Sequence, residues 1–169
     1  MGIQREHFYF KQGLPKVNVI KAKFEEITGL YLSYTSCLQL NELITDEEDV
    51  LRSIEQSVKG PHRHIYRRTY FSCAEFDNVY LGEYLQPETN SFDLECGIRI
   101  ENMYFFQALI KTILELGGRC LDYSFYSEDD RNIDDYLEPY LPHQREWKRI
   151  KNWNEMNAVE RAGFNNPYI

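Results

Sequence analysis

The sequence predicts a two-layer α+β fold, an antiparallel sheet of about four to five strands with helices packed on one face. Several short runs alternate apolar and polar residues, which is the period of a strand, whereas three other segments repeat apolar residues at helical spacing. The strand-like runs in the middle of the chain follow one another directly. That order favours antiparallel pairing over strand-helix-strand units.

Length and composition predict one folded domain. The chain has 169 residues, of which 43% are hydrophobic, enough to bury a sizeable core without disulfides or metals. We expect residues 1–127 to form the α+β domain and residues 1–14 within it to be irregular. Residues 128–169 are expected to form an irregular C-terminal extension packed on the same domain, because they contain too few apolar residues for a core of their own.

Three helices are expected, covering residues 15–28, 45–60 and 103–116. Gly29 directly follows the first, and glycine commonly ends helices. The third helix has a wide apolar arc, which predicts burial on two sides. Either the C-terminal extension or a second copy of the chain would cover its second side.

The expected strands cover residues 30–40, 64–76, 79–85, 92–100 and 120–126. Asp77 and Asn78 separate two of these runs, and both residue types tolerate the positive φ of a tight hairpin turn. A turn at this point would place Phe76 opposite Val79. The register then assigns Val79, Leu81 and the apolar residues of 92–98 to the core face.

The same register predicts a polar and aromatic outer face on the sheet. Its candidate binding residues are Arg67, Phe71, Tyr80, Tyr84 and Glu95. Tyrosine offers a large contact area at low entropic cost, so this face is a candidate recognition surface for another protein. The alternative interpretation is a solvated sheet face, or one that the C-terminal extension covers.

A second candidate site follows from Glu83, which this register places on the core face. A buried carboxylate needs hydrogen bonds or a cation. Together with Arg68 and Tyr70, Glu83 would form a polar pocket between the sheet and the helices, suited to a small ligand or a reaction. The alternative is a half-solvated ion pair of Glu83 with Arg68 near the end of the sheet.

No motif identifies a reaction, a metal or a cofactor. The cysteines at positions 37, 73, 96 and 120 lack the close ligand pairs of a structural zinc site and are expected to be reduced thiols. His62 and His64 lack further ligands of their own. Because the chain also lacks phosphate-binding, serine-hydrolase and zinc-protease motifs, we expect no metal and no cofactor and can name no catalytic residue. The sequence leaves enzymatic activity open and favours a non-enzymatic protein.

The net charge of −8 argues against nucleic-acid binding, which needs a basic field. The chain has no apolar run long enough to span a membrane and no secretory signal, so we expect a cytoplasmic protein. The leading hypothesis is an acidic binding protein, a monomer or weak homodimer, that docks another protein. A basic partner steered by charge would fit, and the protein would inhibit or neutralise it. The alternatives are a small-molecule-binding protein or enzyme that uses the Glu83 pocket, and a homo-oligomeric structural protein built on the 103–116 helix.

Overall fold

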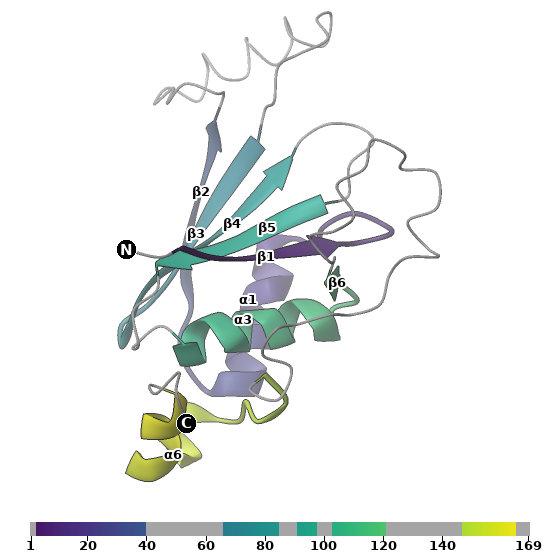
Figure 1. Cartoon of the computed structure of the whole chain (residues 1–169). Coiled ribbons are helices and arrows are strands. Elements are labelled where there is room, and N and C mark those ends of the chain that lie inside the picture. The colour runs from purple at the N-terminus through teal and green to yellow at the C-terminus, as the bar shows by residue number, and fades with distance from the viewer. Residues whose placement is uncertain (1–2, 40–65, 85–90, 98–102, 121–146, 165–169) are drawn as a thin grey trace, which may run out of the picture.

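The computed structural model confirms the α+β class. It describes residues 3–39, 66–84, 91–97, 103–120 and 147–164. The strands are β1 (Ile3–Tyr9), β2 (Ser33–Gln39), β3 (Tyr66–Cys73), β4 (Phe76–Tyr84), β5 (Ser91–Gly97) and β6 (Arg119–Cys120). They form one six-stranded sheet in the order β2-β3-β4-β5-β1-β6, with every neighbouring pair antiparallel. The helices α1 (Val17–Thr28) and α3 (Met103–Glu115) pack against one face of the sheet (Figure 1).

Both of these helices lie where the sequence places them. α1 ends at Gly29, which adopts the left-handed conformation with φ 70° and donates its backbone N–H to the carbonyl of Glu25 at 2.9 Å. The rings of Phe24 on α1 and Phe105 on α3 meet edge to face, with centroids 5.6 Å apart. Phe105 and Leu109 on α3 are fully buried within the single chain.

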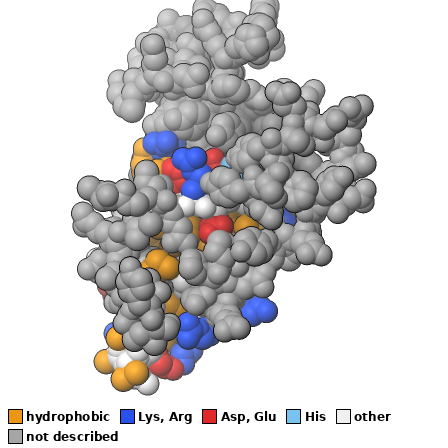
Figure 2. Space-filling view, in the orientation of Figure 1, with side chains coloured by type: hydrophobic (Ala, Val, Ile, Leu, Met, Phe, Trp, Pro, Cys, Tyr) orange, Lys and Arg blue, Asp and Glu red, His pale blue; other side chains and the backbone are white. Residues whose placement is uncertain are grey.

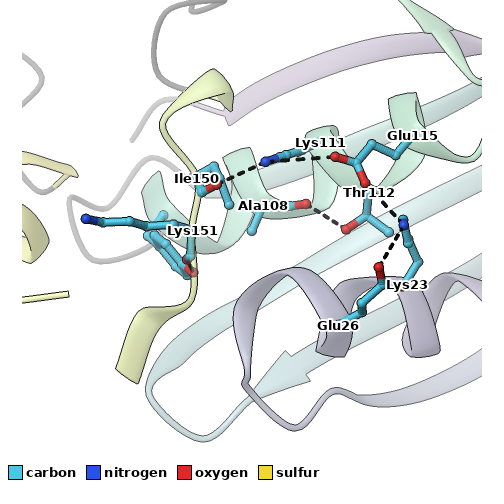
Figure 3. A network of polar contacts seen from close by, with 9 residues as sticks. Lys23, Glu26, Ala108, Lys111, Thr112, Glu115, Ile150 and Lys151 are labelled. Atoms are coloured by element: carbon cyan, nitrogen blue, oxygen red, sulfur yellow. Dashed lines mark hydrogen bonds and ion pairs between the residues drawn. The ribbon is translucent and has the colours of Figure 1, made fainter. Parts of the chain in front are cut away.

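The C-terminal residues 147–164 cover the second side of α3. They contain a short 3-10 helix η4 (Trp153–Glu155) and a helix α6 (Ala158–Phe164), so the expectation of an irregular extension is wrong for this part of it. Lys111 on α3 donates to the carbonyl of Ile150 at 3.0 Å (Figure 3), and the Tyr104 hydroxyl donates to the carbonyl of Lys151. The Tyr104 ring also packs on Trp153, with centroids 4.6 Å apart. Two consecutive backbone carbonyls thus dock this segment on α3.

Gly29 is the point where the same C-terminal segment crosses the end of α1. A side chain there would meet the amide of Asn152 at 2.5 Å from the added Cβ. The carbonyl of Gly29 accepts a hydrogen bond from the amide of Asn154 at 3.2 Å. The position therefore needs glycine both for its positive φ and for the close approach of the segment.

The expectation that residues 1–14 are irregular is wrong for 3–9, because these residues form β1 between β5 and β6. Phe8 lies opposite Phe92 and Cys120 and is fully buried. Glu6 interrupts the apolar alternation on this face and hides the strand pattern. Its carboxylate is buried and accepts from the thiol of Cys120 at 3.8 Å.

The hairpin between β3 and β4 has a different register from the expected one. The turn lies at Ala74 and Glu75, and Phe71 stands opposite Val79. Because the shift is an odd number of residues, it turns β3 over, so Phe71 and Thr69 are buried on the helix side instead of lying on the outer face. Burying a phenylalanine ring stabilises the fold by about 2–3 kcal/mol, more than a local turn preference contributes.

The pairing of β4 with β5 preserves the expected faces. Glu83, not Leu85, lies opposite Phe92, a shift of two residues that leaves each side chain on its expected side. Phe92, Leu94 and Cys96 are buried in the core, which confirms that prediction. The helix expected over 45–60, the turn after Tyr84 and the strand residues 121–126 lie outside the described residues, as does the expected boundary near residue 128.

None of the helices in the described segments is both long enough and apolar enough to cross a lipid bilayer.

Candidate functional site

Two rows of polar and aromatic side chains cross the face of the sheet opposite α1 and α3. One row follows the register from Tyr70 through Tyr80 and Glu95 to Arg5, and the next from Arg68 through Gly82 and Asp93 to His7. We call the seven side chains of these rows the outer-face cluster: Arg5, His7, Arg68, Tyr70, Tyr80, Asp93 and Glu95. Figure 2 shows basic, acidic and histidine side chains next to one another over the part of the molecule where Figure 1 shows the sheet.

Glu95 holds the first row together. One carboxylate oxygen forms an ion pair with Arg5, and the other accepts a hydrogen bond from the Tyr80 hydroxyl. Glu95 is only 7% exposed, and a buried carboxylate is stable when both oxygens have such partners. The Arg5 side chain, in contrast, is 47% exposed. The acid therefore lies beneath the surface and the arginine lies on it.

Tyr80 is the centre of the first row. Burial, together with the hydrogen bond to Glu95, raises the pKa of Tyr80 to about 12, so at neutral pH its hydroxyl stays protonated and donates. The guanidinium of Arg68 stacks over the Tyr80 ring at 4.6 Å from its centroid. The Tyr70 ring lies 5.9 Å from it, tilted by 47°. These contacts hold two tyrosine rings and an arginine in fixed positions.

The second row contains a buried pair. Nδ1 of His7 contacts Oδ1 of Asp93, and both residues are buried. Burial is the main reason that the pKa of His7 falls to about 4 and that of Asp93 rises to about 7, since each charged form loses its hydration. The charge of Arg5 lowers both pKa values and that of Glu95 raises both. Between these values the pair holds one proton and is neutral as a whole.

Gly82 leaves a position without a side chain between Arg68 and Asp93. A Cβ added there would lie 3.9 Å from the nearest atoms of Asp93, so the site has room for it. A glycine within a strand often marks a place where another backbone approaches closely. The gap lies beside the guanidinium that stacks on Tyr80.

The structure combines members of the two predicted sites. Tyr80 and Glu95, predicted for docking, share the outer-face cluster with Arg68 and Tyr70, predicted for a pocket. The two pocket residues lie on the face away from the helices, so the expected position of the pocket between sheet and helices is wrong for them. Phe71 is buried in the core, so its predicted place on the outer face is wrong.

The remaining predicted residues are placed by the register. Arg67 lies opposite Glu83 and is exposed. It is on the same face of β3 as Phe71, the face toward the helices, and not on the outer face with Tyr70. Tyr84 lies opposite Tyr66. The side chains of Glu83 and Tyr84 fall outside the described part of the structure. The pairing does not bring Glu83 opposite Arg68, the ion pair considered from the sequence.

The sequence reasoning missed Arg5 and His7 because it expected an irregular N-terminus. A period-two signal was present, since Phe8 and Phe10 alternate with His7 and Tyr9. All four cysteines are free thiols. Burial raises the pKa of Cys96 to about 12 and also raises the pKa of Cys73, which makes both poor nucleophiles. Within the described ranges, no group of three or more metal-ligating side chains lies close enough together to hold an ion.

No family model, no curated protein and no solved structure matches the chain. Its function is therefore inferred from the geometry of the outer-face cluster.

Proposed function

We propose that the protein is a non-enzymatic binding protein that docks another protein on the outer-face cluster. The observation that carries this proposal is the anchoring of Tyr80, whose hydroxyl is held by buried Glu95 and whose ring is stacked by Arg68. Tyrosine and arginine supply much of the energy of protein interfaces. Holding them in place before binding lowers the entropic cost of association.

The acid and base groups of the cluster support binding rather than catalysis. Glu95 has both oxygens engaged, and His7 and Asp93 contact each other below the surface. A general base has to reach a substrate proton within hydrogen-bonding distance. Groups this buried and this occupied favour a structural role under the half-exposed arginine and tyrosines.

The charge of the chain and the charge of the cluster have separate roles in this proposal. The net charge of −8 favours a basic partner by steering its approach, an effect on association rate more than on contact energy. The contact itself would be made by Tyr70, Tyr80 and Arg68. A partner segment with carbonyl oxygens or a carboxylate for the guanidinium and a flat apolar group for the rings would fit them.

The test is affinity capture from a low-salt extract of the source cells, with the purified protein as bait. Two variants remove docking groups from the edge of the network, Tyr70→Ala and Arg68→Gln. Val159→Ala on α6 is the matched control, because Val159 is 81% exposed and lies outside the cluster. We expect a defined protein that binds the wild type and the control equally and each docking variant about tenfold more weakly.

Equal capture of that protein by all four baits would overturn the proposal, and so would the absence of any captured protein. Native mass spectrometry of the same purified samples distinguishes protein docking from the alternative, small-molecule binding. A small bound mass that disappears in Arg68→Gln would replace docking with small-molecule binding at the same cluster. Thermal unfolding of each variant must match the wild type within a few degrees for the comparison to hold.

A further inference from the structure

The sheet ends in β6 at one edge and in β2 at the other. At one edge the structure describes residues Arg119–Cys120 of β6, which pair with β1. At the other edge β2 pairs with β3 over all seven of its residues, without a bulge. In the parts of the chain that the structure describes, no strand lies beside the outer side of β2, which Figure 1 shows at the end of the sheet.

β2 also lacks the features that usually protect a long edge. Its sequence, SYTSCLQ, contains no charged residue and no proline. Ser33, Tyr34, Thr35 and Ser36 are all exposed, with Tyr34 at 42%. Just before the strand, Tyr31 is 73% exposed and its ring is held by the ammonium of Lys21 at 3.7 Å. An accessible, regular and uncharged strand is a ready template for one more antiparallel strand.

We propose that β2 pairs with β2 of a second copy of this chain, so that two sheets join edge to edge in a two-fold dimer. Two identical antiparallel strands are self-complementary about a two-fold axis. Full overlap of residues 33–39 places the axis at Ser36, with Ser36 opposite its own copy and Thr35 opposite Cys37. No like charges meet in this register, because the strand has none.

The dimer is weak, and its dependence on salt has a definite sign. One added strand pair gives a smaller contact area than a stable obligate dimer buries. Each copy carries a net charge of −8, so the two copies repel until salt screens them. The dimer fraction therefore increases with ionic strength. Docking of a basic partner on the outer-face cluster would weaken under the same change.

Cross-linking tests the register directly. Thr35→Cys places a new thiol opposite Cys37 of the other copy, at a Cα separation that a disulfide can bridge. The other three cysteines are buried and do not compete. Under mild oxidation we expect a covalent dimer from Thr35→Cys, and none from the wild type or from Thr35→Cys combined with Cys37→Ser.

Sedimentation equilibrium of the uncross-linked protein tests the association over about a hundredfold range of concentration. Ser36→Lys puts two ammonium groups opposite each other at the axis and should weaken the dimer about tenfold. Ser33→Lys changes the net charge equally but faces position 39, so it serves as the matched control and should keep the dimer. A monomer at every concentration and salt would overturn the proposal. The proposal would also be overturned by a dimer that persists in Ser36→Lys and is not cross-linked in Thr35→Cys. Such a dimer would form through another surface.

Discussion

The two faces of the sheet bury side chains of opposite chemistry. On the face that carries α1 and α3, Phe8, Phe71 and Leu94 are fully buried in an apolar core. On the outer face, Asp93 and Glu95 are nearly as buried, yet each is held by a polar partner from a neighbouring strand. Apolar packing depends little on pH, whereas buried ionisable groups make stability depend on it strongly. The two faces should therefore respond differently to substitution and to pH.

The largest expected effect separates two adjacent residues of β3. Phe71→Ala removes a fully buried ring from the helix side and should cost about 3–5 kcal/mol of unfolding free energy. Tyr70→Ala removes a half-buried ring from the outer face and should cost about 1 kcal/mol. Urea denaturation of both variants measures the difference. A larger loss for Tyr70→Ala than for Phe71→Ala would mean that the strand is turned over relative to the structure.

His7→Phe should make the protein less stable as pH rises. It leaves Asp93 buried, with a native pKa of about 7 against 3.8 for the ordinary group. A raised pKa means that the native state binds the proton more tightly, so the stabilisation is complete below pH 3.8 and is lost as pH rises to 7. The loss over that window is roughly 4 kcal/mol at most. Urea denaturation across this pH range, relative to the wild type, measures the slope.

Asp93→Asn should give the opposite slope. It leaves His7 buried, with a native pKa of about 4 against the ordinary 6.5. A lowered pKa means that the unfolded state binds the proton more tightly, so the stabilisation is complete above pH 6.5 and is lost as pH falls to 4. The loss over that window is roughly 3 kcal/mol at most. The same denaturation series measures it.

The wild type is the control for both slopes. Between about pH 4 and 6.5 the native pair holds one proton, and so do the two groups in the unfolded chain, so the pair contributes no slope there. Arg5 and Glu95 are present in all three proteins, and their effects cancel in the differences. Slopes of the same sign in the two variants would show that His7 and Asp93 are not buried together.

A smaller effect than the core substitution concerns one hydroxyl on the outer face. Tyr80→Phe keeps the ring under Arg68 but removes the hydrogen bond to buried Glu95, and should cost about 1–2 kcal/mol. Tyr70→Phe is the matched control, because the hydroxyl of Tyr70 makes no hydrogen bond with the described residues. Thermal unfolding compares the two variants. Equal melting temperatures would mean that the hydrogen bond from Tyr80 to Glu95 does not stabilise the cluster.

Local sequence patterns predicted the elements whose apolar residues repeat regularly. α1, α3 and β5 each carry an uninterrupted apolar period, and the structure places them as expected. β1 was missed because Glu6 lies on its buried side, where its carboxylate accepts from the thiol of Cys120, a residue far away in sequence. Short-range periodicity does not contain that long-range contact.

The candidate site was predicted in part, for a similar reason. Tyr80 and Glu95 follow from the alternation within β4 and β5, which the structure retains. Arg68 lies on the same face as Tyr80 and Glu95 only because of the position of the hairpin turn between β3 and β4. The preference of Asp77 and Asn78 for a tight turn was outweighed by the burial of Phe71. The contribution of Arg5 and His7 depends on the pairing of β1 with β5 and β6, which the local alternation of residues does not specify.

The place of β1 in the sheet has a consequence for how the chain acquires its fold. β1 is the first described strand to leave the ribosome, yet its hydrogen-bonding neighbours are β5 on one side and β6 on the other. The described strand partners of β1 begin to emerge only with residue 91 of β5, and its second side waits for residues 119 and 120 of β6. Closing loops this long makes sheet formation slow compared with the growth of a local hairpin such as β3–β4. The sheet is therefore completed late in synthesis, by insertion of its earliest strand between two of its latest.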